Sequence, residues 1–114
     1  MTYVVYNGKG GTDGRGYETW IAESDNLLEW RTLGRVLSYR DGKWDCNQRG
    51  GFPALPDMEW GGSYELQTYK GRHWMTYIGG EGTGYEAVKA PLYVGLAWTK
   101  GDISTAHEWE SLDK

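Results

Sequence analysis

The sequence YVVYNG at residues 3–8 returns as WMTYIG at residues 74–79, 71 positions later, and this repeat is the first evidence of the architecture. Both copies are rich in β-branched and aromatic residues and end in glycine, the pattern of a strand that leads into a turn. Two further matches keep the same order: WIAES at 20–24 with GLAWT at 95–99, and EW at 29–30 with EW at 108–109. The offset grows from 71 to 75 to 79 residues, so the insertions lie in loops, as in diverged repeat units.

Strand-forming composition bounded by glycine and aspartate predicts six strands. They cover residues 3–7, 18–23, 32–37, 63–69, 74–78 and 92–99, and a weak seventh lies near Trp109. Almost nothing predicts helix, and residues 24–30 are expected to form a short polar turn between two strands. Residues 63–69 are expected to be the inner strand of the second unit, joined to the next strand by a tight turn at Lys70 and Gly71.

Antiparallel units repeated along the chain predict an all-β fold, and more specifically a fragment of a β-propeller, whose blades are four-stranded sheets around a channel. We expect about two blades: residues 1–37 as an incomplete first blade, 38–62 as an inter-blade loop and 63–114 as the second blade. Propellers carry roughly four to eight blades. Such a chain is therefore either a piece of a longer protein or self-associates through open blade edges. Trp30 and Trp109, which the repeat matches, are expected to pack between blades.

The composition narrows the classes of partner. Seven tryptophans and nine tyrosines suit strands, and they also suit stacking on the apolar faces of sugar rings. A net charge of −4 argues against a nucleic-acid-binding protein, which needs a basic surface for the phosphate backbone. No apolar stretch approaches the roughly 18 residues of a membrane-spanning helix, and the single Cys46 cannot form a disulfide within the chain.

Three segments resemble a known family. KGRHWMTY at residues 70–77 resembles the turn and strand of furanosidase-type propellers, and IAESDNLLEW at residues 21–30 is similar to their strand and Ser-Asp-x-Leu-x-x-Trp turn. WD at residues 44–45 with GFPAL at 51–55 resembles the entry into a new blade. The resemblance is to five-bladed glycoside hydrolases of the family 43 and family 32 type. It implies cleavage of glycosidic bonds by carboxylates that come from different blades and line a central funnel: a base, a group that tunes the acid, and a general acid.

Propeller topology places the loops at residues 8–17, 38–62 and 79–91 on one rim, where ligand sites are expected. Glycoside hydrolysis needs two carboxyl groups that flank the bond, and our catalytic candidates are Asp45 and Glu65. Asp45 lies at the blade entry, as a base or as the group that tunes the acid. Glu65 lies near the start of the expected inner strand, as a general acid or as a hydroxyl-binding residue.

A further set of residues is expected to bind substrate. Aromatic rings can stack on a sugar, and amide and guanidinium groups can hydrogen-bond its hydroxyls. The expected substrate-binding residues are Trp44, Gln48, Arg49, Asp57, Glu59, Trp60, Tyr85 and Glu86. Glu18 and Glu86 each follow Gly-Tyr at matched places in the repeat, and this recurrence favours a structural role for both.

Other chemistries lack their motifs, and we expect no cofactor and no metal. GKGGT at residues 8–12 lacks the order of a phosphate-binding loop, His73 and His107 have no partner at zinc-ligand spacing, and no G-x-S-x-G nucleophile elbow is present. The expected partner is an oligo- or polysaccharide substrate, with no nucleic acid and no membrane. Two alternatives stay open: a non-catalytic carbohydrate-binding propeller, and a truncated fragment without activity of its own.

Overall fold

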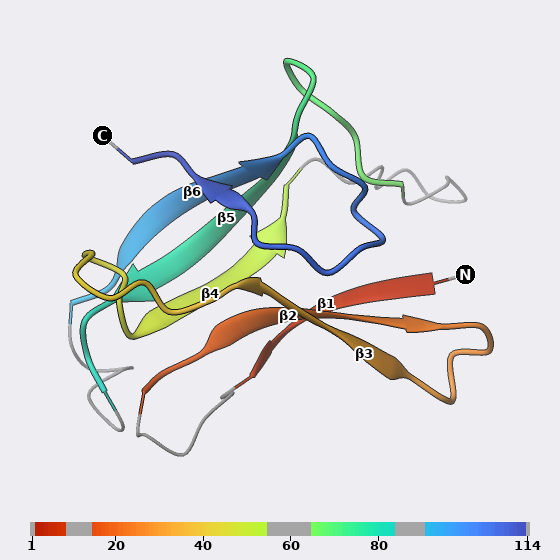
Figure 1. Cartoon of the computed structure of the whole chain (residues 1–114), viewed down its shortest axis with the longest axis horizontal. Coiled ribbons are helices and arrows are strands. Elements are labelled where there is room, and N and C mark those ends of the chain that lie inside the picture. Colours follow the sequence, from red (N-terminus) through yellow and green to blue (C-terminus); the bar gives the residue numbers. More distant parts are fainter. Residues whose placement is uncertain (1, 9–14, 55–64, 84–90, 114) are drawn as a thin grey trace.

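The computed structural model describes residues 2–8, 15–54, 65–83 and 91–113 of the chain. These residues form two antiparallel sheets and contain no helix, so the predicted all-β fold is confirmed (Figure 1). The first sheet holds, in spatial order, β1 (Thr2–Gly8), β2 (Glu18–Ser24) and β3 (Arg31–Leu37). The second sheet holds β4 (Gln48–Pro53), β5 (His73–Gly80), β6 (Tyr93–Thr99) and β7 (Glu110–Ser111). In the part of the chain that the structure describes, no helix is long and apolar enough to span a membrane.

The pairing of strands follows the sequence repeat residue by residue. Val4 lies opposite Ala22 in the first sheet, and Met75 lies opposite Ala97 in the second, so the offsets of 71 and 75 residues preserve the register. The pairing of β3 with β2 and of β7 with β6 extends the match with the offset of 79 residues. The unit β1-β2-β3 therefore corresponds to β5-β6-β7, as the repeat predicted.

An inner strand does pair with β5, but it is not the predicted one. β4 runs antiparallel to β5 from Gln48, opposite Gly80, to Pro53, opposite Met75. The composition of β4, QRGGFP, explains the miss, because two glycines and a proline are typical of a loop. A side chain in place of Gly51 would put a Cβ 2.8 Å from the Met75 sulfur, so close packing requires this glycine.

The predicted inner strand at residues 63–69 is therefore wrong. Residues 65–69 form no strand, and residues 63 and 64 lie outside the described residues. The predicted inter-blade loop at residues 38–62 contains β4, so the second sheet begins before residue 63.

The core lies between the two sheets. Ile21 of the first sheet, Met75 and Ala97 of the second sheet, and Trp109 belong to one buried hydrophobic cluster. Trp109 thus packs between the sheets as predicted, whereas its counterpart Trp30 is 42% exposed. The two tryptophans hold equivalent places in the repeat, so their different burial follows from which face of each sheet is covered.

The two sheets stack head to tail. Val5 packs against the core, whereas its counterpart Thr76 is exposed on the far face of the second sheet. Conversely, Met75 is buried in the core, whereas its counterpart Val4 is exposed on the far face of the first sheet. The interface therefore joins two different faces of the same repeated unit. Such a heterologous contact can be repeated on either side.

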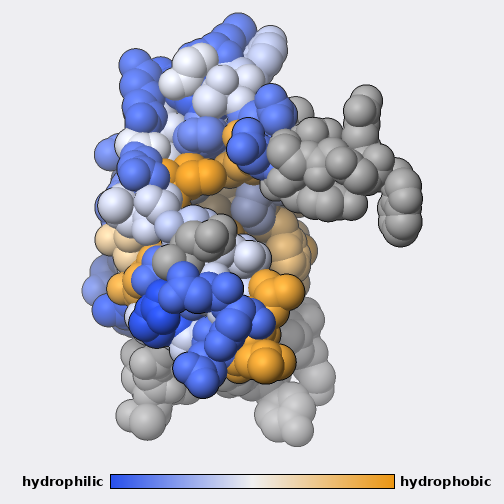
Figure 2. All heavy atoms as spheres, turned by 90° about the vertical axis from the view of Figure 1, so that its right-hand side faces the viewer, coloured by the Kyte–Doolittle hydropathy of each residue, from blue (hydrophilic) through white to orange (hydrophobic). Residues whose placement is uncertain are grey.

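The two ends of the sheets differ. The loop edge comprises residues 15–17, 38–49 and 79–83, and the turn edge comprises residues 65–74 and 98–105. At the turn edge a cavity of about 760 Å³ opens between the sheets, with Val5, Met75 and Trp109 in its lining. Figure 2 views the molecule from this end, where hydrophobic surface lies among hydrophilic side chains.

Candidate functional site

Loops distant in sequence meet at the loop edge, as the predicted topology requires. The Gly16 N–H donates to the Asn47 carbonyl at 2.7 Å, and the Asn47 N–H donates to the Gly80 carbonyl at 3.1 Å. Arg15 forms a β-bridge with Thr83. The prediction that these loops share one rim is confirmed for their described residues, and the candidate site is built from this edge.

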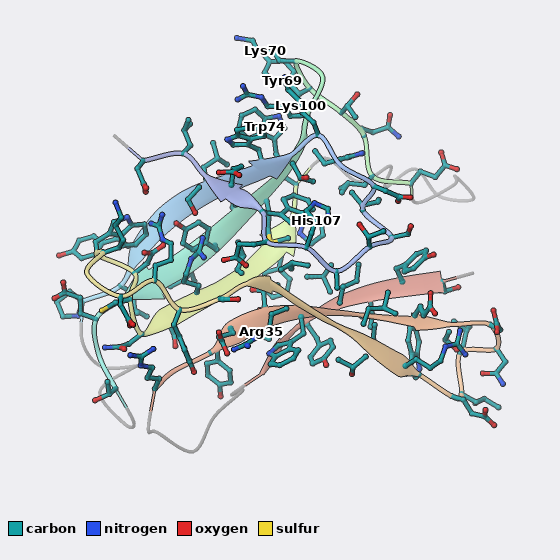
Figure 3. All side chains as sticks on the ribbon, in the orientation of Figure 1. Arg35, Tyr69, Lys70, Trp74, Lys100 and His107 are labelled. Carbon is teal, nitrogen blue, oxygen red and sulfur yellow. The ribbon has the colours of Figure 1, made fainter. Side chains whose placement is uncertain are left out.

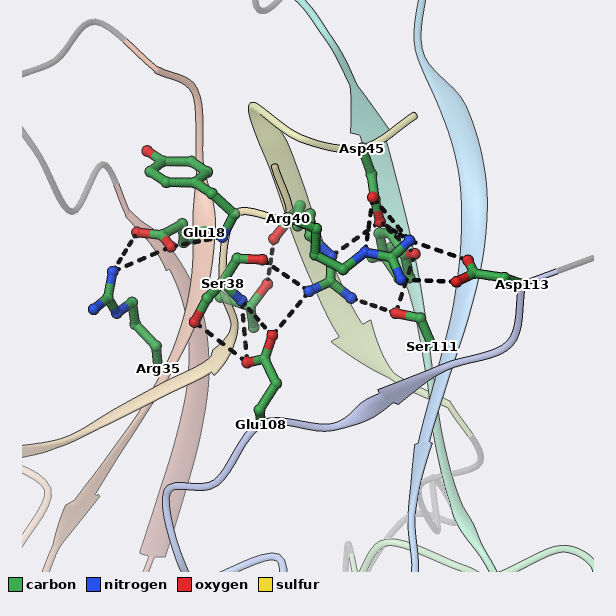
Figure 4. Close-up of polar contacts among 12 residues, drawn as sticks. Glu18, Arg35, Ser38, Arg40, Asp45, Glu108, Ser111 and Asp113 are labelled. Carbon is green, nitrogen blue, oxygen red and sulfur yellow. Dashed lines mark hydrogen bonds and ion pairs between the residues drawn. The ribbon is translucent and has the colours of Figure 1, made fainter. Parts of the chain in front are cut away.

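Asp45 lies at the loop edge with both carboxylate oxygens occupied (Figure 4). The Arg40 guanidinium donates to Oδ1 through Nε and to Oδ2 through Nη2, both at 2.9 Å. The Tyr77 hydroxyl donates to Oδ2 at 2.7 Å, and Arg49 Nε lies 3.0 Å from the same oxygen. Asp45 is fully buried. It cannot approach a sugar without breaking these contacts, which favour a structural role over a catalytic one.

The two arginines carry the network to the C-terminal residues. Arg40 forms a second bidentate pair with Asp113, at 2.9 and 3.0 Å. Arg49 donates to Glu108 at 3.0 Å and to the Ser111 hydroxyl. We call the set Arg40, Asp45, Arg49, Tyr77, Glu108, Ser111 and Asp113 the ionic cluster. It fastens the connection between β3 and β4 to the strand at the opposite side of the second sheet.

The ionic cluster shifts pKa values in directions that preserve its contacts. Hydrogen bonding to Asp113, joined by that to Asp45, raises the pKa of Arg40. Hydrogen bonding to Arg40 holds the pKa of Asp113 below its ordinary value. Burial raises the pKa of the Tyr77 hydroxyl, which therefore stays protonated and donates to Asp45.

The pair of Arg40 and Asp113 should make stability depend on acid pH. Because folding lowers the pKa of Asp113, the pair stabilises the chain above the unfolded carboxyl pKa of about 3.9. This stabilisation is lost as pH falls through the lower folded pKa. We expect Asp113→Asn to remove no more than about 1 kcal/mol at neutral pH, because solvent screens a side chain that is 39% exposed. Urea unfolding at neutral and acid pH measures the difference, and an unchanged pH dependence in the variant would contradict the assignment.

Glu65 lies at the turn edge rather than beside Asp45. It lines the cavity between the sheets together with Pro53 and Met75, whereas Asp45 lies against Gly79. Those two places are at opposite ends of the pair formed by β4 and β5. The prediction that Glu65 begins an inner strand at the rim is wrong, and the structure does not bring the two predicted catalytic carboxylates together.

Three of the predicted substrate-binding residues belong to the framework of the loop edge. Gln48 and Arg49 are buried, and Gln48 Oε1 accepts a hydrogen bond from the Tyr17 N–H at 2.6 Å, which ties the two sheets together. Trp44 is half-buried and stacks on Tyr77, with ring centroids 5.7 Å apart and ring planes at 14°. These contacts occupy the groups that we expected to meet a sugar.

The other predicted substrate-binding residues lie outside the described residues and stay predictions. They are Asp57, Glu59, Trp60, Tyr85 and Glu86. The nearest described residues before them differ in place. Ala54, which precedes the first three, donates its N–H to the Trp74 carbonyl near the turn edge, whereas Thr83, which precedes the last two, lies at the loop edge.

Glu18 has the structural contacts that we predicted, although the reason given for them was wrong. It is fully buried, pairs with Arg35 at 3.3 Å and accepts a hydrogen bond from the Tyr39 N–H at 3.0 Å (Figure 4). The register places Tyr93 in the second sheet at the position that Glu18 holds in the first. Glu86 is therefore not the counterpart of Glu18.

Sequence reasoning missed two exposed carboxylates at the loop edge. The side chain of Asp41 is 81% exposed and pairs with Arg15 at 2.9 Å. Glu81 is exposed, and the Asn47 amide donates to its backbone carbonyl at 2.7 Å. No motif marks either residue, because their place follows only from the convergence of the loops. Within the described ranges, no three His, Cys, Asp or Glu side chains are grouped so as to hold a metal ion.

Comparison with known proteins gives one kind of match. No protein-family model and no curated protein matches the chain. Among solved structures, one described as "Glycoside hydrolase" and one described as a complex of BT0996 and RGII are each 91% identical to the chain, with a TM-score of 0.87. Each match covers 98% of this chain and 33% of the solved chain. The chain therefore spans about a third of the length of the solved chains that it matches.

Proposed function

We propose that this chain is a segment of a glycoside hydrolase, and that the longer protein cleaves glycosidic bonds in a polysaccharide. The observation that carries the proposal is the 91% identity, over 98% of this chain, to a solved protein described as a glycoside hydrolase. Two proteins so similar share their backbone and nearly all of their contacts. The second match supports a carbohydrate as the substrate, because its description names RGII, a polysaccharide.

The proposed architecture of the longer protein is a five-bladed propeller of the family 43 and family 32 type. Its support is the head-to-tail stacking of two repeated units, in which Met75 is buried and its counterpart Val4 is exposed. Each sheet thus keeps one face that corresponds to a buried face of the other. Repetition of the same step would cover both faces and, with closure of the ring, would leave no open edge.

In this proposal the loop edge is the rim that faces the substrate. Hydrolysis needs two carboxyl groups at the bond, and Asp41 and Glu81 are the exposed carboxylates that the described residues bring to this rim. Asp45 is assigned a positioning role through Arg40 and Arg49. The remaining catalytic groups come from other blades. Tyr85 and Glu86 stay proposed substrate-binding residues.

A hybrid protein tests the proposal directly. The segment of the solved glycoside hydrolase that matches this chain would be replaced by the 114 residues of this chain. We expect the hybrid to fold and to release reducing sugar from polysaccharide at a rate within about threefold of the parent. The unmodified parent is the positive control, and chromogenic arabinosides, xylosides and fructosides report the sugar that is recognised.

The outcomes separate the three functional classes. A folded hybrid that hydrolyses the parent's substrates supports the proposal. A folded hybrid that binds polysaccharide without cleaving it would favour a non-catalytic carbohydrate-binding propeller. A folded hybrid that neither binds nor cleaves would mean that this sequence has lost the function of its neighbour.

A further inference from the structure

Three cationic side chains gather at the turn edge, away from the loop edge. Lys70, Arg72 and Lys100 lie at the ends of β5 and β6. The register places His73 opposite Thr99, so the residues next to this pair, Arg72 and Lys100, are neighbours across the two strands. Figure 3 shows Lys70 and Lys100 at the same corner of the molecule. Like charges this close repel one another, so an anion among them would be attracted.

The turn that holds Lys70 is sharply defined. Backbone hydrogen bonds of 2.9 and 3.2 Å between Tyr69 and Arg72 close it. Lys70 has a φ of 53° and Gly71 a φ of 72°, both in the left-handed region of a tight two-residue hairpin turn. A lysine adopts this conformation at some cost. The turn therefore presents Lys70 in a fixed place at the exposed tip.

Arg72 is held flat against an indole. Its guanidinium carbon lies 3.9 Å from the centre of the Trp98 ring and 5.8 Å from that of Trp74. An arginine stacked in this way keeps its N–H donors, which lie in the guanidinium plane, directed away from the ring. Stacking thus fixes the orientation of the donors without using them.

Arg72 differs from the other arginines in its charge partners. Arg15, Arg31, Arg35, Arg40 and Arg49 each pair with at least one carboxylate. Within the described ranges, no carboxylate lies within ion-pair distance of Arg72, Lys70 or Lys100. Asp102, two residues after Lys100, accepts hydrogen bonds from the backbone and hydroxyl of Ser104. The described carboxylates thus leave these three cations uncompensated.

An exposed aromatic ring completes the surface. Tyr69 is 57% exposed, and the Lys70 ammonium lies 5.5 Å from the centre of its ring. The Trp74 indole N–H donates to the Tyr69 carbonyl at 2.9 Å, which fixes the residue beside the stacked arginine. A flat apolar ring bordered by cations matches one ligand well: a sugar ring that carries a carboxylate.

We propose that the turn edge binds a carboxylate-bearing saccharide, such as a uronic acid residue in an oligosaccharide. The carboxylate accepts hydrogen bonds from Arg72 and is flanked by Lys70 and Lys100, and the sugar ring lies on Tyr69. The choice of a saccharide over other anions rests on the proposed function. The site lies at an end of the second sheet, and because sheets stack through their faces, further sheets would leave this end open.

Binding of the 114-residue chain to a short oligomer of galacturonic acid, measured by calorimetry, tests the proposal. We expect Arg72→Gln to weaken binding by about tenfold, since it removes a charge-assisted, bidentate contact. The fully methyl-esterified oligomer, which keeps the sugar rings but lacks the charge, should bind no better to the original chain than the acid form binds to the variant. Binding of the acid form should also weaken as salt is added.

A matched charge change elsewhere is the control. Lys43→Gln removes the same charge at the loop edge, and it should leave affinity unchanged. Near-ultraviolet circular dichroism shows whether each variant keeps the fold, and Tyr69→Ala, which leaves all cations in place, gives a second measure of the site. Equal binding of the acid and ester forms, or equal loss in the Arg72 and Lys43 variants, would overturn the proposal. Equally tight binding of polyglutamate would overturn the choice of a saccharide. Because this assay needs no hydrolysis, its failure is distinct from failure of the hybrid enzyme.

Discussion

Asp45→Asn is expected to lower the free energy of unfolding by about 3–5 kcal/mol, the usual result of breaking a buried ion pair from one side. Asp45 is fully buried, and Arg40 and Arg49 share its carboxylate. Asparagine has nearly the same shape but carries no charge. The fully buried Arg49 would then keep only the partly exposed Glu108 as an ionic partner. The expected loss is thus electrostatic and owes little to packing.

Urea unfolding followed by tryptophan fluorescence measures this loss. Asp41→Asn is the matched control, because Asp41 pairs with Arg15 in an exposed position and such pairs contribute about 0–1 kcal/mol. A loss of less than about 1 kcal/mol for Asp45→Asn, equal to that of the control, would contradict the role of the ionic cluster in stability.

The same substitution separates a positioning role from a catalytic one. In the hybrid enzyme, a positioning residue should lose activity in proportion to the unfolded fraction, and cooling or added stabilising osmolyte should restore it. A catalytic Asp45 would instead abolish turnover in a fully folded variant. We expect the first pattern, because both oxygens of Asp45 are occupied by Arg40 and Tyr77.

The sequence was sufficient for those parts of the fold that depend on local composition and on the repeat. The matched offsets reproduce the register of three strands in each sheet, because insertions fall in loops and leave paired residues in step. The inner strand was misplaced for a physical reason. Gly51 is required by the close approach of Met75, so packing selected residues in β4 that on their own indicate a loop.

The candidate site was harder to predict because its contacts join residues far apart in the chain. Asp45 and Arg49 were identified as polar residues of a rim loop, and their place at that rim was right. Their partners Glu108 and Asp113 lie near the other end of the chain, and no local pattern links them to Arg40 or Arg49. Sequence reasoning therefore located the edge but could not tell exposed groups from those consumed by the framework.

Trp109→Ala and Trp30→Ala form a matched pair whose comparison tests the propeller. In the 114-residue chain we expect Trp109→Ala to cost about 3–5 kcal/mol, because a large buried ring is lost from the core. Trp30→Ala should cost about 1 kcal/mol or less, since that ring is 42% exposed. Thermal and urea unfolding of the two variants give the comparison directly.

In the hybrid enzyme the two costs should become similar. Trp30 and Trp109 hold equivalent places in the repeat, and Trp109 is buried because the first sheet covers the face on which it lies. If another sheet is stacked by the same step on the far face of the first sheet, it buries Trp30 in the same way. Acrylamide quenching should then be strong for Trp30 in the 114-residue chain and weak in the hybrid, read from variants that lack one tryptophan at a time. If Trp30 stays open to quencher in a folded and active hybrid, the longer protein does not continue the stack, and the propeller must be abandoned while the assignment as a glycoside hydrolase stands.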